Sequence, residues 1–145
     1  MKRKIFNGIS LYDQNKNPVN AHGSCIVQEN GTYYLFGEYK TDDVNKYIGF
    51  SCYSTEDFMN WKFEGFVLPP LKEGILGENR IGERVKVVKR KNAEGYTMLM
   101  HTDDMKYCDP CIGLATGTKL NEKFTFQGPL LFKGEPIRFW DMGTF

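Results

Sequence analysis

Two segments of the chain carry the same succession of strand-like runs, and this internal repeat restricts the fold more than any other feature. The first segment ends in Phe63–Leu68 (FEGFVL) and the second in Phe126–Leu131 (FQGPLL), which lies 63 positions later. The two segments also begin at a similar spacing, because Glu83 follows His22 by 61 positions. Recurrence of one four-stranded unit is typical of a β-propeller, in which each unit forms a blade.

Each unit contains four short runs rich in β-branched and aromatic residues, separated by turn residues. Asn30-Gly31 joins the first two runs and suits a type I′ turn, since both residues tolerate positive φ. No longer segment has a 3.6-residue period, so we expect an all-β protein with almost no helix. The runs cover Ser24–Gln28, Thr32–Gly37, Ile48–Ser54 and Trp61–Leu68, then Arg84–Lys89, Tyr96–His101, Ile112–Thr116 and Phe124–Leu131.

The predicted architecture is a β-propeller of four-stranded antiparallel blades, with about two blades plus the start of a third in one partial domain over 1–145. We place a lead-in segment at 1–20, the first blade at 21–68, the second at 83–131 and the start of the third at 139–145. A β-sandwich also has short strands and frequent turns, but it does not account for the Phe-x-Gly sequence that closes both units. At about 60 residues per blade, the 145 residues span a little over two blades.

The charge balance and the cysteines exclude several classes of partner. With 19 Lys and Arg against 18 Asp and Glu, the net charge is +1, whereas proteins that bind nucleic acids or membrane surfaces usually carry an excess of basic residues. No apolar run approaches the ~20 residues that span a bilayer. No apolar stretch follows the basic N-terminus, so we recognise no signal peptide and assign no location.

One close cysteine pair, with no histidine at ligand spacing, predicts reduced thiols and neither a metal nor another cofactor. The cysteines are Cys25, Cys52, Cys108 and Cys111.

Polar residues recur where the inner strand of each unit begins. In a propeller these starting ends meet at one mouth of the central channel. The positions are His22, Glu83 with Arg84, and Asp141. The adjacent guanidinium lowers a carboxyl pKa, so we expect Glu83 to stay ionised and to accept hydrogen bonds from hydroxyls. Each acid taken alone is more often a solvated loop charge or half of a structural ion pair, but recurrence at equivalent repeat positions favours a site for Glu83 and Asp141.

Each hairpin returns the end of its second strand to the same rim. This adds Glu38 from the first unit, and His101 with Asp103 and Asp104 from the second. Tyr107, in the loop that follows, can supply a flat face for a sugar ring. Glycoside hydrolysis uses two carboxyl groups of different pKa, one protonated and one ionised. The predicted rim therefore suits carbohydrate chemistry.

Six motifs in order resemble the N-terminal half of glycoside hydrolase family 43, and they are most similar to its branch of exo-β-1,3-galactosidases that act on galactans. The resemblance covers about residues 10–145. Each motif alone is weak, and the ordered set is specific. The motifs are Asn20–Gly23 (NAHG), Tyr33–Glu38 (YYLFGE), Tyr53–Trp61 (YSTEDFMNW), Glu83–Val87 (ERVKV), Met98–His101 (MLMH) and Trp140–Met142 (WDM).

The resemblance implies a five-bladed propeller, a glycosidase that inverts anomeric configuration, and an oligo- or polysaccharide partner. By motif match, Asp141 is the carboxylate that orients the general acid and tunes its pKa. His22 stands where most of the family carry the Asp that acts as general base, a replacement that the galactanase-like branch shares. Relatives are often periplasmic or secreted. Together with the rim residues found above, the candidate substrate-binding set is Glu38, Glu83, Tyr107, His22, Arg84 and His101.

Two departures from the family pattern affect what the chain can do. Val85 replaces the Pro of the family's Glu-Arg-Pro-Lys, which loosens this turn although Val suits a strand. The family's general-acid Glu lies on a later blade, so no residue here takes that role and we expect the chain alone to be inactive. The alternative is a non-catalytic carbohydrate-binding or self-assembling propeller fragment. Two blades cannot close a ring, so the chain would associate with itself or pair with further blades.

Overall fold

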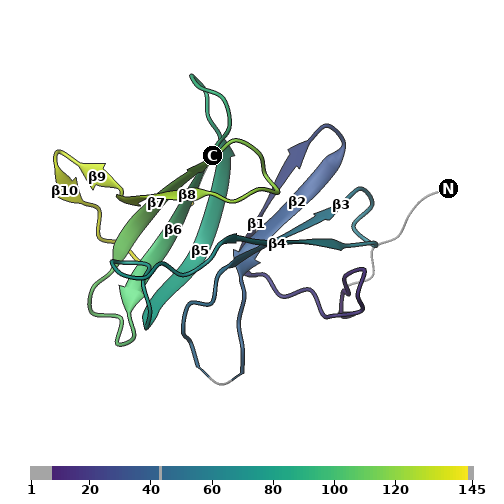
Figure 1. The fold of residues 1–145 in the computed structure, drawn as a ribbon, viewed down its shortest axis with the longest axis horizontal. Helices are drawn as coiled ribbons and strands as arrows, with labels where there is room; N and C mark the ends of the chain where they lie inside the picture. Colours follow the sequence, from purple (N-terminus) through teal and green to yellow (C-terminus); the bar gives the residue numbers. More distant parts are fainter. Residues whose placement is uncertain (1–7, 43, 144–145) are drawn as a thin grey trace.

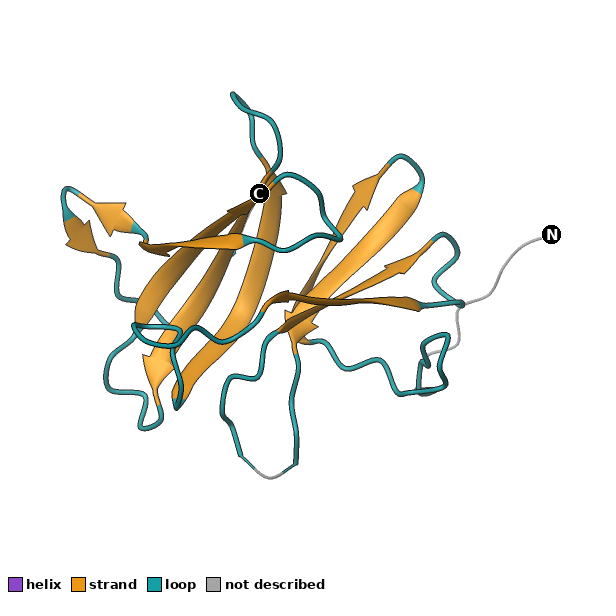
Figure 2. Ribbon diagram, viewed as in Figure 1, coloured by secondary structure: helices purple, strands orange, loops and turns teal. Residues whose placement is uncertain are grey.

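The computed structural model describes residues 8–42 and 44–143, which form two four-stranded antiparallel sheets and one small hairpin (Figures 1 and 2). No helix occurs in these two ranges. The first sheet contains β1 (His22–Glu29), β2 (Thr32–Glu38), β3 (Phe50–Thr55) and β4 (Lys62–Leu68). The second contains β5 (Arg80–Lys89), β6 (Tyr96–Asp104), β7 (Cys111–Gly117) and β8 (Thr125–Pro129), and the hairpin pairs β9 (Leu131–Phe132) with β10 (Glu135–Pro136).

In both sheets the strands lie in chain order, so each sheet is a simple meander. This order is that of propeller blades and differs from the crossed connections of a β-sandwich. The sheets lie beside one another because β5, the first strand of the second sheet, packs on β1 and β2 (Figure 1). The predicted all-β fold built from four-stranded antiparallel blades is confirmed.

The strand bounds differ from the expected runs at several places, and two of the differences in the second blade have a clear cause. β5 begins at Arg80, four residues before the expected start, because its pairing with β6 continues past an irregularity that follows Glu83. β8 ends at Pro129, since Leu131 pairs within the β9–β10 hairpin instead. Residues 139–143 form no strand, and 144–145 lie outside the described residues, as do 1–7 of the lead-in segment. The start of a third blade therefore stays a prediction.

Local turn chemistry accounts for how the strands connect. Asn30 and Gly31 have φ of 50° and 86°, the positive values that a type I′ turn requires. This tight connection sets the register of β1 against β2, in which Ile26 faces Leu35 and Glu29 faces Thr32.

The repeated Phe-x-Gly sequence forms the same irregularity in the outer strand of each blade. In β4, Phe63 and Gly65 pair with consecutive residues of β3, and in β8, Phe126 and Gly128 pair with consecutive residues of β7. The residue between them is therefore an extra one, as in a β-bulge. The two glycines have φ of 125° and 112°, values that side chains rarely allow.

The hydrophobic core lies between the two sheets and holds them as one unit. The Phe36 and Phe124 rings meet edge to face with centroids 6.3 Å apart, and the Phe124 N–H donates to the Val67 carbonyl at 2.8 Å. Burying side chains of this size stabilises a fold by about 1.5–3 kcal/mol each. The core includes Phe50, Leu68, Leu76, Val85, Val87, Met98, Met100, Ala115 and Leu120. This packing fixes the position of β5 against β1, and hence of their polar starting ends.

Candidate functional site

The inner strands of both blades carry a bulge at equivalent positions. In β1 the register shifts between His22 and Cys25, and in β5 it shifts between Glu83 and Lys86. Before each shift, His22 pairs with Glu38 and Glu83 pairs with His101. The two strand pairs therefore present their polar residues at corresponding points of the rim, as the repeat predicts.

The residue after each polar position has a left-handed backbone. Gly23 has φ of 53° and Arg84 has φ of 55°. A Cβ at Gly23 would lie 3.0 Å from Glu38 Oε1 and 3.1 Å from the Arg84 nitrogen. Glycine at this position therefore allows the two blades to approach each other closely beside the site.

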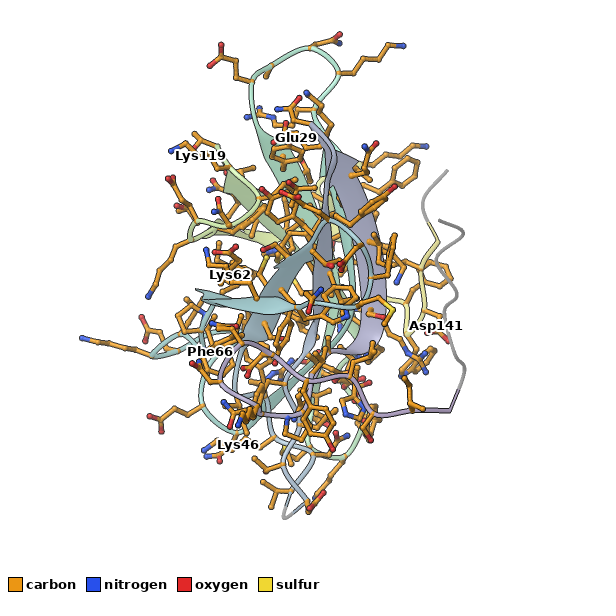
Figure 3. All side chains as sticks on the ribbon, turned by 90° about the vertical axis from the view of Figure 1, so that its right-hand side faces the viewer. Glu29, Lys46, Lys62, Phe66, Lys119 and Asp141 are labelled. Carbon is orange, nitrogen blue, oxygen red and sulfur yellow. The ribbon has the colours of Figure 1, made fainter. Side chains whose placement is uncertain are left out.

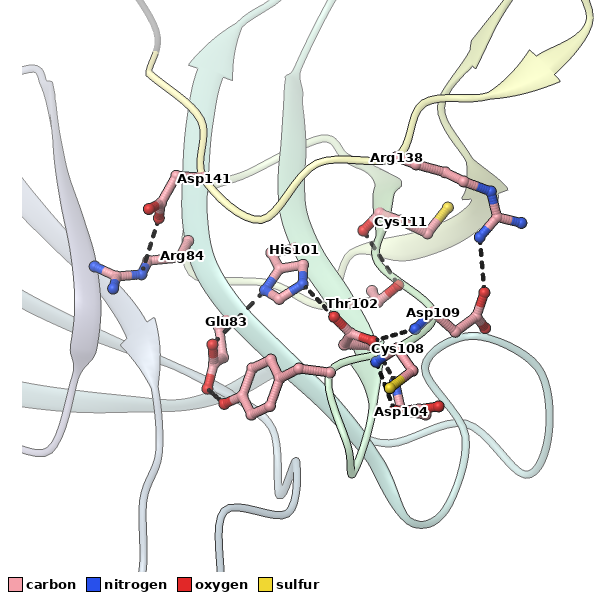
Figure 4. Close-up of polar contacts among 12 residues, drawn as sticks. Glu83, Arg84, His101, Thr102, Asp104, Cys108, Asp109, Cys111, Arg138 and Asp141 are labelled. Atoms are coloured by element: carbon pink, nitrogen blue, oxygen red, sulfur yellow. Dashed lines mark hydrogen bonds and ion pairs between the residues drawn. The ribbon is translucent and has the colours of Figure 1, made fainter.

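Glu83 is the centre of the polar cluster (Figure 4). Its Oε1 accepts hydrogen bonds from the Tyr107 hydroxyl at 2.8 Å and from Lys40 Nζ and Asn45 Nδ2, each at 3.2 Å. Its Oε2 lies 3.7 Å from His101 Nδ1. The interaction with His101 and these donors outweigh burial and lower the pKa of Glu83 to about 2. Glu83 is thus an ionised acceptor.

The Arg84 guanidinium does not pair with Glu83, the neighbouring carboxylate whose pKa it was expected to lower. Its Nε lies 3.1 Å from Asp141 Oδ1, so the guanidinium pairs with the other predicted rim acid (Figure 4). Both side chains of this pair are exposed. In Figure 3, Asp141 lies on the side of the molecule opposite Lys62 and Lys119. Glu83 stays ionised through His101, Tyr107 and its other donors.

Glu38 differs from Glu83 in its titration. Burial raises the pKa of Glu38, and the ion pair between Lys40 Nζ and Glu38 Oε2, at 2.7 Å, opposes that rise. Lys40 also contacts Glu83, so one ammonium lies between two carboxylates that would otherwise repel. Two neighbouring carboxyl groups with pKa values shifted in opposite directions are the pattern that acid–base sites use.

His101 lies behind Glu83, not at the surface. Its side chain is about 1% exposed, and its Nε2 lies 3.1 Å from Asp103 Oδ2. Burial lowers the pKa of the imidazole, but the carboxylates of Glu83 and Asp103 outweigh it and the net shift is upward. His101 therefore lies beneath the rim, and its direct contact with a substrate stays a prediction.

Tyr107 lies in the loop after β6 with φ of 57°, and its ring stacks on His101 with centroids 6.3 Å apart. The ring is exposed. His22 is also exposed. The structure thus brings Glu38, Glu83 and Tyr107 together, with His101 beneath them, while Arg84 and Asp141 form a separate exposed pair.

Sequence reasoning missed Lys40 and Asn45. Lys40 is positioned by Asn20, whose Nδ2 donates to the Lys40 carbonyl at 2.7 Å and whose Oδ1 accepts from the Lys40 nitrogen at 3.0 Å. Asn45 contacts both the Tyr107 hydroxyl and Lys40. Both residues come from the loop between β2 and β3, which carries no repeat. Only the Asn20 motif offered a signal for Lys40.

In the described parts of the chain, no group of three or more His, Cys, Asp or Glu side chains is placed to hold a metal ion. The four cysteines are unpaired, and burial raises the pKa of the Cys25, Cys52 and Cys111 thiols. No helix among the described residues is long and apolar enough to cross a membrane.

Among the comparisons with known proteins, only the one with solved structures finds matches. No family model matches the sequence, and no curated protein does. An exo-β-1,3-galactanase from Phanerochaete chrysosporium, solved with galactose, is 29% identical with a TM-score of 0.85 over 94% of this chain. The chain resembles glycoside hydrolase family 43. It spans only 32% of the length of that fungal galactanase.

Two further structures place the family 43 resemblance in the same branch. An exo-β-1,3-galactanase from Clostridium thermocellum is 31% identical, with a TM-score of 0.78 over 86% of this chain and 27% of its own length. A family 43 β-1,3-galactosidase solved with galactodeoxynojirimycin is 28% identical, with a TM-score of 0.78 over 86% of this chain and 38% of its own. The predicted resemblance to galactan-active members of the family is confirmed.

Proposed function

We propose that this chain supplies part of the sugar-binding rim of an inverting exo-glycosidase that acts on β-linked galactose-containing glycans. One observation carries the proposal: Glu83 on the inner strand β5 is ionised and accepts a hydrogen bond from the exposed Tyr107 hydroxyl. An ionised carboxylate is a strong acceptor for sugar hydroxyls. The similar fungal galactanase was solved with galactose and, as a variant, with β-1,3-galactotriose, which supports galactose as the bound sugar.

Within this proposal each rim residue has a role that its surroundings support. Glu38 and Glu83 accept hydrogen bonds from sugar hydroxyls, which replace part of the Lys40 and Asn45 contacts. Tyr107 offers both its hydroxyl and an exposed ring face. Asp141, held by Arg84, orients the general acid that another part of a complete propeller supplies. His22 lines the rim and does not act as the base.

Removing the charge of Glu83 tests the proposal. Glu83→Gln keeps the shape of the side chain but loses the charge-assisted hydrogen bonds, so galactose affinity should fall roughly tenfold. NMR titration of the 145-residue chain with methyl β-galactoside measures this. Glu122→Gln, which changes an exposed Glu paired with Lys119, is the matched control and should bind as the wild type does. Equal affinity of the Glu83→Gln and wild-type chains would reject the proposal.

A second observation concerns the exposed apolar side chains that follow the second blade. Leu131, Phe132, Phe139 and Trp140 are each more than half exposed, in and just after the β9–β10 hairpin (Figure 1). Exposed apolar groups of this size mark interaction surfaces. We propose that they contact a further blade-like sheet, in the way that β5 contacts β1 and β2.

A further inference from the structure

Asp103 lies at the end of β6, two residues after His101, and its side chain is completely buried. Burying an ionised carboxylate is costly unless hydrogen bonds and charges satisfy both of its oxygens. Here both are satisfied, and by different parts of the site. Oδ2 lies 3.1 Å from His101 Nε2, and Oδ1 accepts the backbone N–H groups of Asp104 at 2.8 Å and Asp109 at 2.7 Å.

The first contact reaches Glu83 through the imidazole. His101 has a carboxylate at each ring nitrogen, Asp103 at Nε2 and Glu83 at Nδ1. Because the ring is buried, these two contacts determine which way it faces (Figure 4). Asp103 thereby holds the imidazole with its Nδ1 3.7 Å from Glu83 Oε2, without itself touching the exposed rim.

The second contact reaches Glu83 through the turn over residues 104–109. Asp103 accepts from the first and last amides of that turn, while Asp104 Oδ1 accepts from the nitrogens of Lys106 and Cys108. The turn holds Tyr107 in its left-handed conformation and directs its hydroxyl to Glu83 Oε1 at 2.8 Å. The two routes from Asp103 therefore end on the two oxygens of Glu83.

We propose that Asp103 is the positioning residue of this rim, with one buried carboxylate that holds both His101 and the Tyr107 turn and, through them, both oxygens of Glu83. This inference rests on the proposed galactose-binding role of Glu83 and adds a supporting residue to it. A side chain that is already held in its binding orientation binds a ligand more tightly, because less conformational entropy is lost on binding. Asp103 makes no contact with the sugar.

Two substitutions separate the two contacts. In Asp103→Asn the side-chain carbonyl still accepts both amide hydrogens, but an NH₂ group replaces the oxygen that faces His101. In Asp103→Ala both contacts are lost. Asp57→Asn is the matched control, because Asp57 also accepts backbone amides of a turn, those of Met59 and Asn60 between β3 and β4.

Three measurements on the full chain read the contacts independently. Long-range ¹⁵N NMR follows the titration of His101, which is faced by Glu83 from β5, by Tyr107 from the turn and by Asp103 from its own strand. Amide hydrogen exchange at Asp104 and Asp109 reports the turn. Titration with methyl β-galactoside reports the rim.

The expected pattern distinguishes positioning from a general loss of structure. Asp103→Asn should lower the pKa of His101 by about one unit or more and leave amide exchange near that of the wild type. Asp103→Ala should also speed exchange at Asp104 and Asp109, and it should weaken sugar binding roughly tenfold. Asp57→Asn should change none of the three. Unchanged His101 titration and unchanged exchange in Asp103→Ala would overturn the inference.

The wild-type chain alone keeps the inference testable if both Asp103 variants fail to fold. Its His101 must titrate above the ordinary histidine range, and its Asp104 and Asp109 amides must be protected. Ordinary titration together with fast exchange would reject the role of Asp103. Absence of galactose binding to the wild type would instead reject the proposed function, while the NMR measurements still decide how Asp103 acts.

Discussion

At the scale of single residues, both blades pair a histidine with a glutamate, but the two residue types have swapped strands. The first places His22 on its inner strand opposite Glu38, and the second places Glu83 opposite His101. The environments differ, because His101 is buried between two carboxylates whereas His22 is exposed. The swapped pair thus places a buried histidine in the second blade and an exposed histidine in the first.

The Glu83–His101 pair predicts a window of maximal stability in pH. The pKa of Glu83 is lowered from 4.5 to about 2, so its contribution is present above 4.5 and is lost as the pH falls toward 2. The pKa of His101 is raised above 6.5, so its contribution is present below 6.5 and is lost as the pH rises through the folded value. Stability from the pair is therefore greatest between these two reference values.

Urea unfolding at about pH 3, 5.5 and 9 measures this window. The wild-type free energy of unfolding should be highest near the middle value, and His101→Gln should flatten the profile. His22→Gln, which removes the exposed histidine of the first blade, should leave the shape of the profile unchanged. Superimposable profiles for His101→Gln and the wild type would show that the pair does not contribute.

At the scale of elements, the outer strands depend on their Phe-x-Gly bulges. The glycine of each bulge has a φ that side chains rarely adopt, yet a Cβ at Gly65 or at Gly128 would meet no heavy atom within 4 Å. The requirement for glycine is therefore conformational and not steric. The two positions recur because each blade bends its last strand at the same point.

Gly65→Ala and Gly128→Ala should each lower the free energy of unfolding by about 1–3 kcal/mol, the usual cost of forcing a side chain into such a conformation. Gln127→Ala, at the exposed extra residue of the second bulge, should change it by no more than about 0.5 kcal/mol. Chemical denaturation of the three variants beside the wild type provides the comparison. Equal stability of a glycine variant and Gln127→Ala would mean that the bulge adopts another backbone.

At the scale of the whole molecule, the two sheets form an arc in which the second blade has one face packed on the first. The apolar residues of the β9–β10 region have no such neighbour within the described residues. The chain also spans 32% of the length of the fungal galactanase. An arc of this kind presents a rim but does not surround a sugar.

The arc predicts that the 145-residue chain releases no galactose from a β-1,3-linked galactan. Inverting hydrolysis needs a protonated carboxyl group beside the leaving oxygen and a base for water, whereas Glu83 is ionised and Glu38 is paired with Lys40. Sugar release measured by chromatography should not exceed that of Glu83→Gln. Release above that variant would contradict the prediction.

The exposed apolar side chains of the β9–β10 region predict self-association of the isolated chain. Because Phe132 is 66% exposed and Trp140 54%, burying these rings against another copy is favourable. Light scattering across a concentration series should give a mass above 16.7 kDa. Phe132→Ser with Trp140→Ser should shift the mass toward that of one chain. A wild-type chain that stays monomeric throughout the series would count against the proposed partner surface.

Sequence pattern alone determined the eight strands of the two sheets, their order and the class of fold. The runs of β-branched and aromatic residues, the Asn30-Gly31 turn and the repeated Phe-x-Gly are local signals, since strand preference and turn conformation depend on neighbours in the chain. The same repeat predicted that Glu38 and Glu83 occupy one rim, and motif order predicted the resemblance to the galactanases.

Only the tertiary structure decided what each rim residue contacts. Arg84 turns to Asp141 instead of Glu83, His101 lies beneath the surface, and Lys40 and Asn45 reach the site from a loop without repeats. Such contacts depend on how two sheets pack and where a loop folds back, which local pattern does not encode. Sequence spacing places these residues in the same region. Burial and charge pairing then determine what each residue can do there.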